Sequence, residues 1–363
     1  MTSVCRILRL KTAIIDEEDG VMLRFRNLFL AIGLSLYVTV SLAACGAETI
    51  PEIKTAVTSE DKTDIVSKVK TVLAPEEVSY SYKEYPLERN GIALHLDCVS
   101  SEEANPEKNI LLIHGVTYSS HEFDVDYEDY SLVRKLAREG YDVWRLDIAG
   151  FGQSQEVEDG FMPDSDYAAE DINAAVEEIS GLTGQDKIDI LGWSWGTVTV
   201  SRFAALHDEH IDKIVLYAPI LSGLGEFEVT EAFHHNTWEH AVDDFQRDDN
   251  GDIDLKITDP VVVDVFASNS WRYDGEQSPN GGRRDICVSE SEKLMDLSKI
   301  TVPTLVICGD SDPYLNYDLV ADALASLPEG SKLEMIKGGS HVVYIEKPFY
   351  RDFQEKVVEF LKA

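Results

Sequence analysis

The nine residues 188–196, Ile-Asp-Ile-Leu-Gly-Trp-Ser-Trp-Gly, decide the fold of this chain. An apolar run of strand length leads directly into G-W-S-W-G, and a helical spacing of apolar residues begins near Thr197. This order is the strand-turn-helix context that a G-x-S-x-G sequence requires. Glycines at both ends suit a turn that is too tight for side chains, and the strain of such a turn pushes the hydroxyl of Ser194 clear of the backbone.

Short apolar runs alternate with helical patterns on both sides of this stretch. Two strands at residues 78–85 and 92–99 are predicted to form a hairpin, because Asn90-Gly91 between them favours a tight turn. The later apolar runs predict strands at residues 110–113, 141–146, 188–191, 214–217, 304–308 and 333–336. Apolar residues spaced three and four apart predict helices at residues 132–138, 167–180, 197–206, 317–327 and 349–361. This sequence of elements predicts an α/β fold with a mainly parallel sheet and helices on both faces.

Residues 221–300 interrupt the alternation with an acidic stretch that carries several aromatic residues. Loops of that length without structure are uncommon inside compact domains, so we expect a small, largely helical cap insertion. Ligands of open α/β sheets bind outside the carboxyl ends of the strands. An insertion that follows a strand would lie over the edge of the sheet where the strands end, and we expect it to cover a ligand site there.

A serine hydroxyl is a weak nucleophile unless a base takes its proton. Catalysis by Ser194 would therefore require a histidine base and a carboxylate that orients it. His341 lies in Gly-Gly-Ser-His directly after the last predicted strand, where a loop can bring an imidazole back over the sheet edge. Two carboxylate candidates, Asp310 and Asp312, follow the penultimate strand. The resulting chain order of serine, aspartate and histidine is that of α/β-hydrolases and differs from the chymotrypsin and subtilisin orders.

Taken together, these motifs resemble the α/β-hydrolase superfamily. The shared segments are His114-Gly115, the Asp147-x-x-Gly150-x-Gly152-x-Ser154 loop, the G-W-S-W-G turn, the G-x-x-D loop and His341 followed by Glu346-Lys347-Pro348. The resemblance covers about residues 78–363. It implies an α/β-hydrolase fold with an eight-stranded, mainly parallel sheet, helices on both faces and a helical cap.

The resemblance also implies roles for particular residues. Ser194 would be the nucleophile, His341 the general base and acid, and Asp312 the group that orients His341. Asp312 is preferred to Asp310 because the family's acid stands three positions after the strand-ending glycine. The backbone N–H groups of Val116 and Trp195 would form the oxyanion hole. His114 is expected to be structural.

The sequence favours hydrolysis of a small-molecule carboxylic ester without a cofactor. Serine in the turn argues against haloalkane dehalogenases and epoxide hydrolases, which use aspartate there. The Ser-Trp-Gly triplet resembles proline iminopeptidases, but residues 114–118 depart from their His-Gly-Gly-Pro-Gly segment. Three alternatives remain: an iminopeptidase-like enzyme, a hydrolase of carbon–carbon bonds, and a non-catalytic binding protein on the same fold.

No metal site is expected in the insertion. Its cluster of His234, His235, Glu239 and His240 lacks the H-E-x-x-H spacing of a zinc-binding helix.

The first 44 residues are typical of an export signal. Arg24 and Arg26 precede an apolar run at residues 28–40, and small residues follow directly before Cys45. This pattern resembles the lipobox of bacterial lipoproteins, in which Cys45 would carry the lipid. Translation from Met22 is an alternative start, and an uncleaved membrane anchor is an alternative interpretation of the apolar run. Residues 45–77 are polar and predict a flexible tether.

The chain has 363 residues and a formal net charge of −35, with 32 basic against 67 acidic residues. Affinity for nucleic acid depends on clustered Lys and Arg, so this balance argues against a nucleic-acid binder. It equally argues against attachment to an anionic membrane by charge alone. We therefore expect an exported protein held at the cell envelope through the lipid on Cys45. The sequence leaves its oligomeric state open.

Overall fold

The computed structural model describes residues 78–102 and 108–363. The predicted export signal at 1–44, the lipidation site Cys45 and the tether at 45–77 lie outside the described residues. Within the described part of the chain, no helix combines the length and apolar character needed to cross a membrane.

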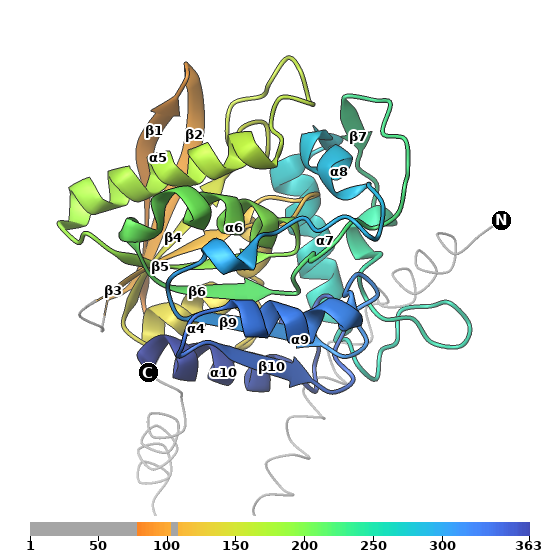
Figure 1. Ribbon diagram of the computed structural model, residues 1–363. Coiled ribbons are helices and arrows are strands. Elements are labelled where there is room, and N and C mark those ends of the chain that lie inside the picture. Colours follow the sequence, from red (N-terminus) through yellow and green to blue (C-terminus); the bar gives the residue numbers. More distant parts are fainter. Residues whose placement is uncertain (1–77, 103–107) are drawn as a thin grey trace, which may run out of the picture. The chain divides into compact units, whose positions relative to one another are not determined.

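Eight strands form one sheet in the order β1-β2-β4-β3-β5-β6-β9-β10 (Figure 1). The first three strands are β1 (Tyr80–Arg89), β2 (Ile92–Ser101) and β3 (Lys108–Ile113). The others are β4 (Tyr141–Asp147), β5 (Ile188–Trp193), β6 (Ile211–Tyr217), β9 (Thr304–Gly309) and β10 (Lys332–Ile336). Strand β2 pairs antiparallel with both β1 and β4, and all other pairs of this sheet are parallel. The predicted mainly parallel sheet is confirmed.

The β1–β2 hairpin turns at the predicted dipeptide. Asn90 has φ 52° and Gly91 has φ 79°, so both central residues occupy the left-handed region that a tight two-residue hairpin turn requires. The pairing of Arg89 with Ile92 follows directly from that turn.

Helices cover both faces of the sheet. One face of the sheet shares an apolar core with three helices, α5 (Ser165–Thr183), α6 (Trp195–His207) and α9 (Tyr317–Ser326) (Figure 1). The opposite face shares a second core with α4 (Leu132–Arg138) and α10 (Tyr350–Lys362). Strand β3 contributes to both cores, because successive side chains of a strand point to opposite faces. Its residues Leu111 and Ile113 pack into the first core, while Ile110 and Leu112 pack into the second.

The insertion between β6 and β9 differs in part from the expected helical cap. It contains α7 (Pro260–Asp274) and the short α8 (Gly281–Ile286), but also a two-stranded antiparallel sheet of β7 (Phe233–His235) and β8 (Gln277–Pro279). Much of the remaining insertion is irregular chain with single turns of 3-10 helix. Figure 1 shows α7 and α8 beside the edge of the sheet at which β6, β9 and β10 end.

Hydrogen bonds from α7 and α8 join the insertion to loops at that edge. The carboxylate of Asp274, the last residue of α7, accepts hydrogen bonds from the backbone N–H of Ser119 at 3.0 Å and of Gly152 at 3.1 Å. Arg283 of α8 donates to the hydroxyl of Thr117 at 2.7 Å. The insertion is thereby held over the loop that follows β3.

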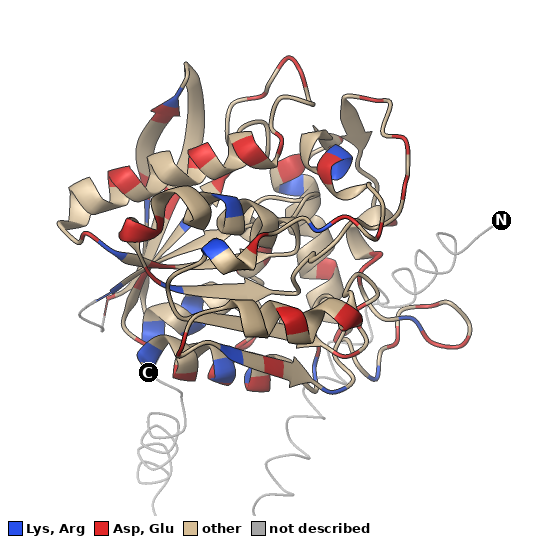
Figure 2. Cartoon of the chain, in the orientation of Figure 1, with Lys and Arg blue, Asp and Glu red and all other residues tan. Residues whose placement is uncertain are grey.

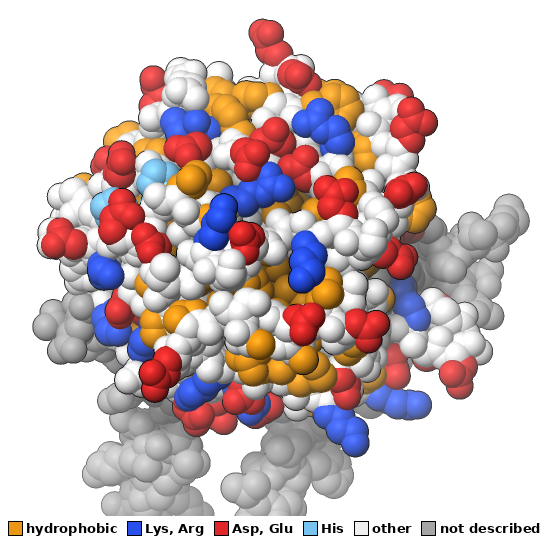
Figure 3. Space-filling view, viewed as in Figure 1, with side chains coloured by type: hydrophobic (Ala, Val, Ile, Leu, Met, Phe, Trp, Pro, Cys, Tyr) orange, Lys and Arg blue, Asp and Glu red, His pale blue; other side chains and the backbone are white. Residues whose placement is uncertain are grey.

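Acidic residues are spread over the elements and are not gathered on one of them (Figure 2). On the face shown in Figure 3, basic side chains lie among the acidic ones. The excess of acid is therefore a general property of this surface.

Candidate active site

Ser194 occupies the turn between β5 and α6, as the G-x-S-x-G spacing predicts. Its backbone has φ 55° and ψ −123°, a conformation that costs free energy for a residue with a side chain. The backbone N–H of Ser194 donates to the carbonyl of Tyr217 at 3.0 Å, which fixes the turn against β6. The sequence prediction of a strained strand-turn-helix is confirmed.

Both glycines of the turn are required by close backbone contacts. A Cβ on Gly192 would lie 2.4 Å from the carbonyl oxygen of Gly196. A Cβ on Gly196 would lie 2.5 Å from the carbonyl oxygen of Ile113. The end of β3 therefore lies directly against the start of α6.

His341 and Asp312 meet at the same sheet edge as the serine. The Nδ1 of His341 lies 2.9 Å from Oδ2 of Asp312, and both side chains are almost fully buried. Their two loops touch, because a Cβ on Gly309 would lie 1.9 Å from the carbonyl oxygen of Gly339. Asp310 is exposed, and its carboxylate accepts a hydrogen bond from the backbone N–H of Gly338. Of the two carboxylates proposed from the sequence, Asp312 is the one that contacts His341.

The backbone of His341 is fixed by two aromatic side chains that sequence reasoning did not single out for this purpose. The hydroxyl of Tyr217 donates to the carbonyl oxygen of His341 at 2.6 Å, and the indole of Trp193 donates to the same atom at 3.1 Å. Tyr217 ends β6 and Trp193 ends β5. The position of the imidazole thus depends on neighbouring strands of the sheet.

Two opposing effects act on the pKa of His341. Burial alone would lower it, but the charge of Asp312 and the hydrogen bond to that carboxylate raise it, and the charge of Asp244 adds to the rise. The net direction is upward from the ordinary value of 6.5. A raised pKa makes the imidazole a stronger base once it is neutral.

The two residues expected to supply the oxyanion-hole N–H groups are the neighbours of Gly115 and of Ser194 in the sequence, Val116 and Trp195. In the described chain, neither the N–H of Val116 nor that of Trp195 donates to a protein acceptor. Gly115 lies beside the nucleophile, since a Cβ there would be 3.4 Å from Cβ of Ser194. The N–H of Gly115 already donates to the buried carboxyl of Glu122 at 3.0 Å, so it is not available to a substrate.

His114 has the structural role that the sequence predicts. Its Nε2 accepts a hydrogen bond from the N–H of Ile148 at 3.1 Å, so Nδ1 carries the proton toward the carbonyl of Gly115 at 2.7 Å. Burial lowers its pKa, which is consistent with a neutral ring.

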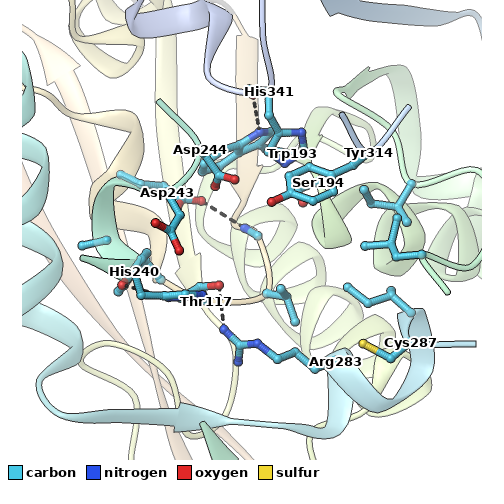
Figure 4. A pocket seen from close by; sticks show the side chains of 18 of the residues that line it. Thr117, Trp193, Ser194, His240, Asp243, Asp244, Arg283, Cys287, Tyr314 and His341 are labelled. Carbon is cyan, nitrogen blue, oxygen red and sulfur yellow. Dashed lines mark hydrogen bonds between the residues drawn. The ribbon is translucent and has the colours of Figure 1, made fainter. Parts of the chain in front are cut away.

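Ser194 and His341 open on one cavity of about 220 Å³ between the sheet edge and the insertion (Figure 4). The insertion contributes Phe266, Ile286 and Leu224 as apolar lining and Asp243, Asp244, His240 and Arg283 as polar lining. Val116, Trp193 and Tyr314 complete the wall near the serine. A cavity of this size suits a small ligand with both apolar and charged parts.

The histidines of the insertion do not form a metal-binding cluster. His234 and His240 lie with ring centroids 4.4 Å apart, but His235 is exposed. Among the residues that the structure describes, no group of three or more His, Cys, Asp or Glu could hold a metal ion.

Comparison with known proteins matches this chain to one sequence family and several relatives. A family described as "Serine aminopeptidase, S33" matches residues 104–348. A bifunctional esterase/perhydrolase of Acinetobacter calcoaceticus is 26% identical over 258 residues, which span 64% of this chain and 84% of the relative. A proline iminopeptidase of Lactobacillus helveticus is 23% identical over 269 residues, which span 68% and 87%. The enol-lactonase of Burkholderia xenovorans LB400 has a TM-score of 0.58 at 19% identity, over 77% of this chain and all of the other.

Proposed function

Because the chain belongs to the family described as "Serine aminopeptidase, S33" and has the α/β-hydrolase fold, we propose that it is a serine hydrolase that cleaves carboxylic esters. The observation that carries the proposal is the hydrogen bond of 2.9 Å between His341 and Asp312, next to a strained Ser194 on the same cavity. The esterase activity in the name of the Acinetobacter relative supports the same reaction class.

In the proposed mechanism, Oγ of Ser194 attacks the ester carbonyl while Nε2 of His341 takes the hydroxyl proton. Asp312 keeps the proton on Nδ1 and stabilises the imidazolium. The N–H groups of Val116 and Trp195 bind the oxyanion, each donor being worth roughly 3 kcal/mol in the transition state. His341 then returns the proton to the leaving alcohol, and a water activated by the same imidazole hydrolyses the acyl-enzyme.

Two measurements on the full chain in detergent test this function. We expect turnover of short 4-nitrophenyl esters and covalent labelling by a fluorophosphonate, with Ser194→Ala abolishing both. A chain that is folded but shows neither turnover nor labelling would refute the proposal and favour a non-catalytic binding protein.

A second candidate is an aminopeptidase that releases an amino-terminal residue. Asp243 and Asp244 line the cavity and could bind an ammonium group, and one relative is named a proline iminopeptidase. Against this candidate, the sequence of residues 114–118 differs from the His-Gly-Gly-Pro-Gly segment of proline iminopeptidases. Turnover of proline 4-nitroanilide well above that of 4-nitrophenyl esters would favour this candidate.

We also propose export and lipidation at Cys45, on the strength of the basic flank, the apolar run and the small residues before the cysteine. Metabolic labelling with a clickable fatty acid tests the proposal. We expect label on the wild-type chain and none on Cys45→Ala, and equal labelling of the two would count against it.

A further inference from the structure

Arg283 lines the cavity from α8 with three neutral hydrogen-bond partners. Its guanidinium donates to the hydroxyl of Thr117 at 2.7 Å, to Oδ1 of Asn280 at 3.2 Å and to the hydroxyl of Ser278 at 3.4 Å. No carboxylate of the described residues forms an ion pair with it, and the charge of Asp244 acts on it only from a longer distance. Its positive charge therefore faces the cavity without a contacting counter-ion from the described chain.

Two other arginines with little exposed side chain, Arg145 and Arg89, are paired with aspartates. Arg145 forms ion pairs with Asp97 and Asp124, and Arg89 forms one with Asp171 at 2.6 Å. The pKa of Arg145 is raised despite burial, whereas burial lowers the pKa of Arg283 to about 10. A charge taken from water without an opposite charge costs free energy, which a bound anion would offset.

The guanidinium contacts the loop that carries one of the two expected oxyanion donors. Thr117, its nearest partner, directly follows Val116, and consecutive Cα atoms are about 3.8 Å apart. Figure 4 shows Arg283 at the end of the cavity opposite His341, with Thr117 and His240 between them and Asp244 next to His341. An anionic substituent at the Arg283 end of the cavity would be farther from Asp244 than one placed beside His341.

We propose that the ester substrate carries a carboxylate a few bonds from the scissile carbonyl, and that this carboxylate pairs with Arg283. The inference rests on the proposed ester hydrolysis and narrows it to half-esters of dicarboxylic acids and related compounds. Arginine suits this task because its planar fork binds a carboxylate through two parallel hydrogen bonds.

The test compares two esters with the same leaving group, mono-4-nitrophenyl glutarate and 4-nitrophenyl pentanoate. Ser194→Ala supplies the background rate, which matters because a half-ester can hydrolyse by attack of its own carboxylate. We expect the wild-type kcat/KM to be at least tenfold higher for the glutarate. Arg283→Met should reduce that ratio at least tenfold, and Arg283→Lys should retain part of it.

Arg284 provides the matched control, because it follows Arg283 on α8 but is exposed and contacts the carbonyl of Phe161. Arg284→Gln should leave the ratio unchanged. If Arg283→Met does not fold, the role of Arg283 is tested by the glutarate-to-pentanoate ratio of kcat/KM in the wild type and in Arg283→Lys.

A wild-type chain that hydrolyses pentanoate as fast as glutarate would overturn the role of Arg283 and leave ester hydrolysis standing. Absence of both turnover and fluorophosphonate labelling would instead overturn the proposed function itself. If labelling occurs without turnover, protection of Ser194 from labelling by free glutarate supports the inference, and lack of protection contradicts it.

Discussion

The hydroxyl of Tyr217 donates a hydrogen bond of 2.6 Å to the carbonyl oxygen of His341, so a strand of the central sheet fixes the backbone of the proposed base. The indole of Trp193 binds the same oxygen from the neighbouring strand. The imidazole is thus placed by buried side chains and not by its loop alone.

Tyr217→Phe should reduce kcat/KM about tenfold, which corresponds to about 1.4 kcal/mol of lost transition-state stabilisation. The ring still fills its site, but the carbonyl of His341 keeps one partner fewer. Steady-state kinetics and thermal unfolding check this. Tyr141→Phe is the control, because Tyr141 is also buried but begins β4, at the end of the strand away from the site. Equal kinetics for the two variants would contradict a positioning role.

The kcat/KM of the enzyme should rise with pH through a midpoint above 6.5, because His341 acts as a base only when neutral and its pKa is raised. Asp244→Asn removes one charge that raises this pKa, so the midpoint should move to lower pH. A pH profile of ester hydrolysis measures both. Asp243→Asn is the control, and its midpoint should stay in place.

Asp312→Asn should lower kcat by about 10⁴, the order found when the carboxylate of a comparable triad is replaced by an amide. The amide cannot hold the required tautomer of His341. Asp310→Asn should cost far less, because Asp310 contacts the backbone of Gly338 and not the imidazole. Single-turnover kinetics of the two variants separates them, and the reverse order of effects would refute the assignment.

Gly196→Ala should destabilise the fold by about 1–3 kcal/mol, since the added methyl would meet the carbonyl oxygen of Ile113 at 2.5 Å. Gly181→Ala in α5 is the matched control, because a Cβ there meets no atom within 4 Å. That control should gain up to about 1 kcal/mol from reduced backbone entropy in the unfolded chain. Urea unfolding monitored by circular dichroism measures both changes.

Much of the sheet could be predicted from the sequence because its signals are local. Alternating apolar runs and the Asn90-Gly91 turn place the strands, and motif order places Ser194, Asp312 and His341 at one sheet edge. The strands β7 and β8 could not be predicted, since three residues are too few for a periodic pattern. The contacts of Arg283 with Thr117 and of Tyr217 with His341 join segments far apart in the chain, which no local pattern reveals.

The most direct test of the proposed mechanism is the mass of the intact protein during turnover of 4-nitrophenyl butyrate, after an acid quench. We predict a butyryl adduct that maps to the peptide containing Ser194 and is absent from Ser194→Ala. Undiminished ester turnover by Ser194→Ala, or an adduct on another residue, would contradict the account.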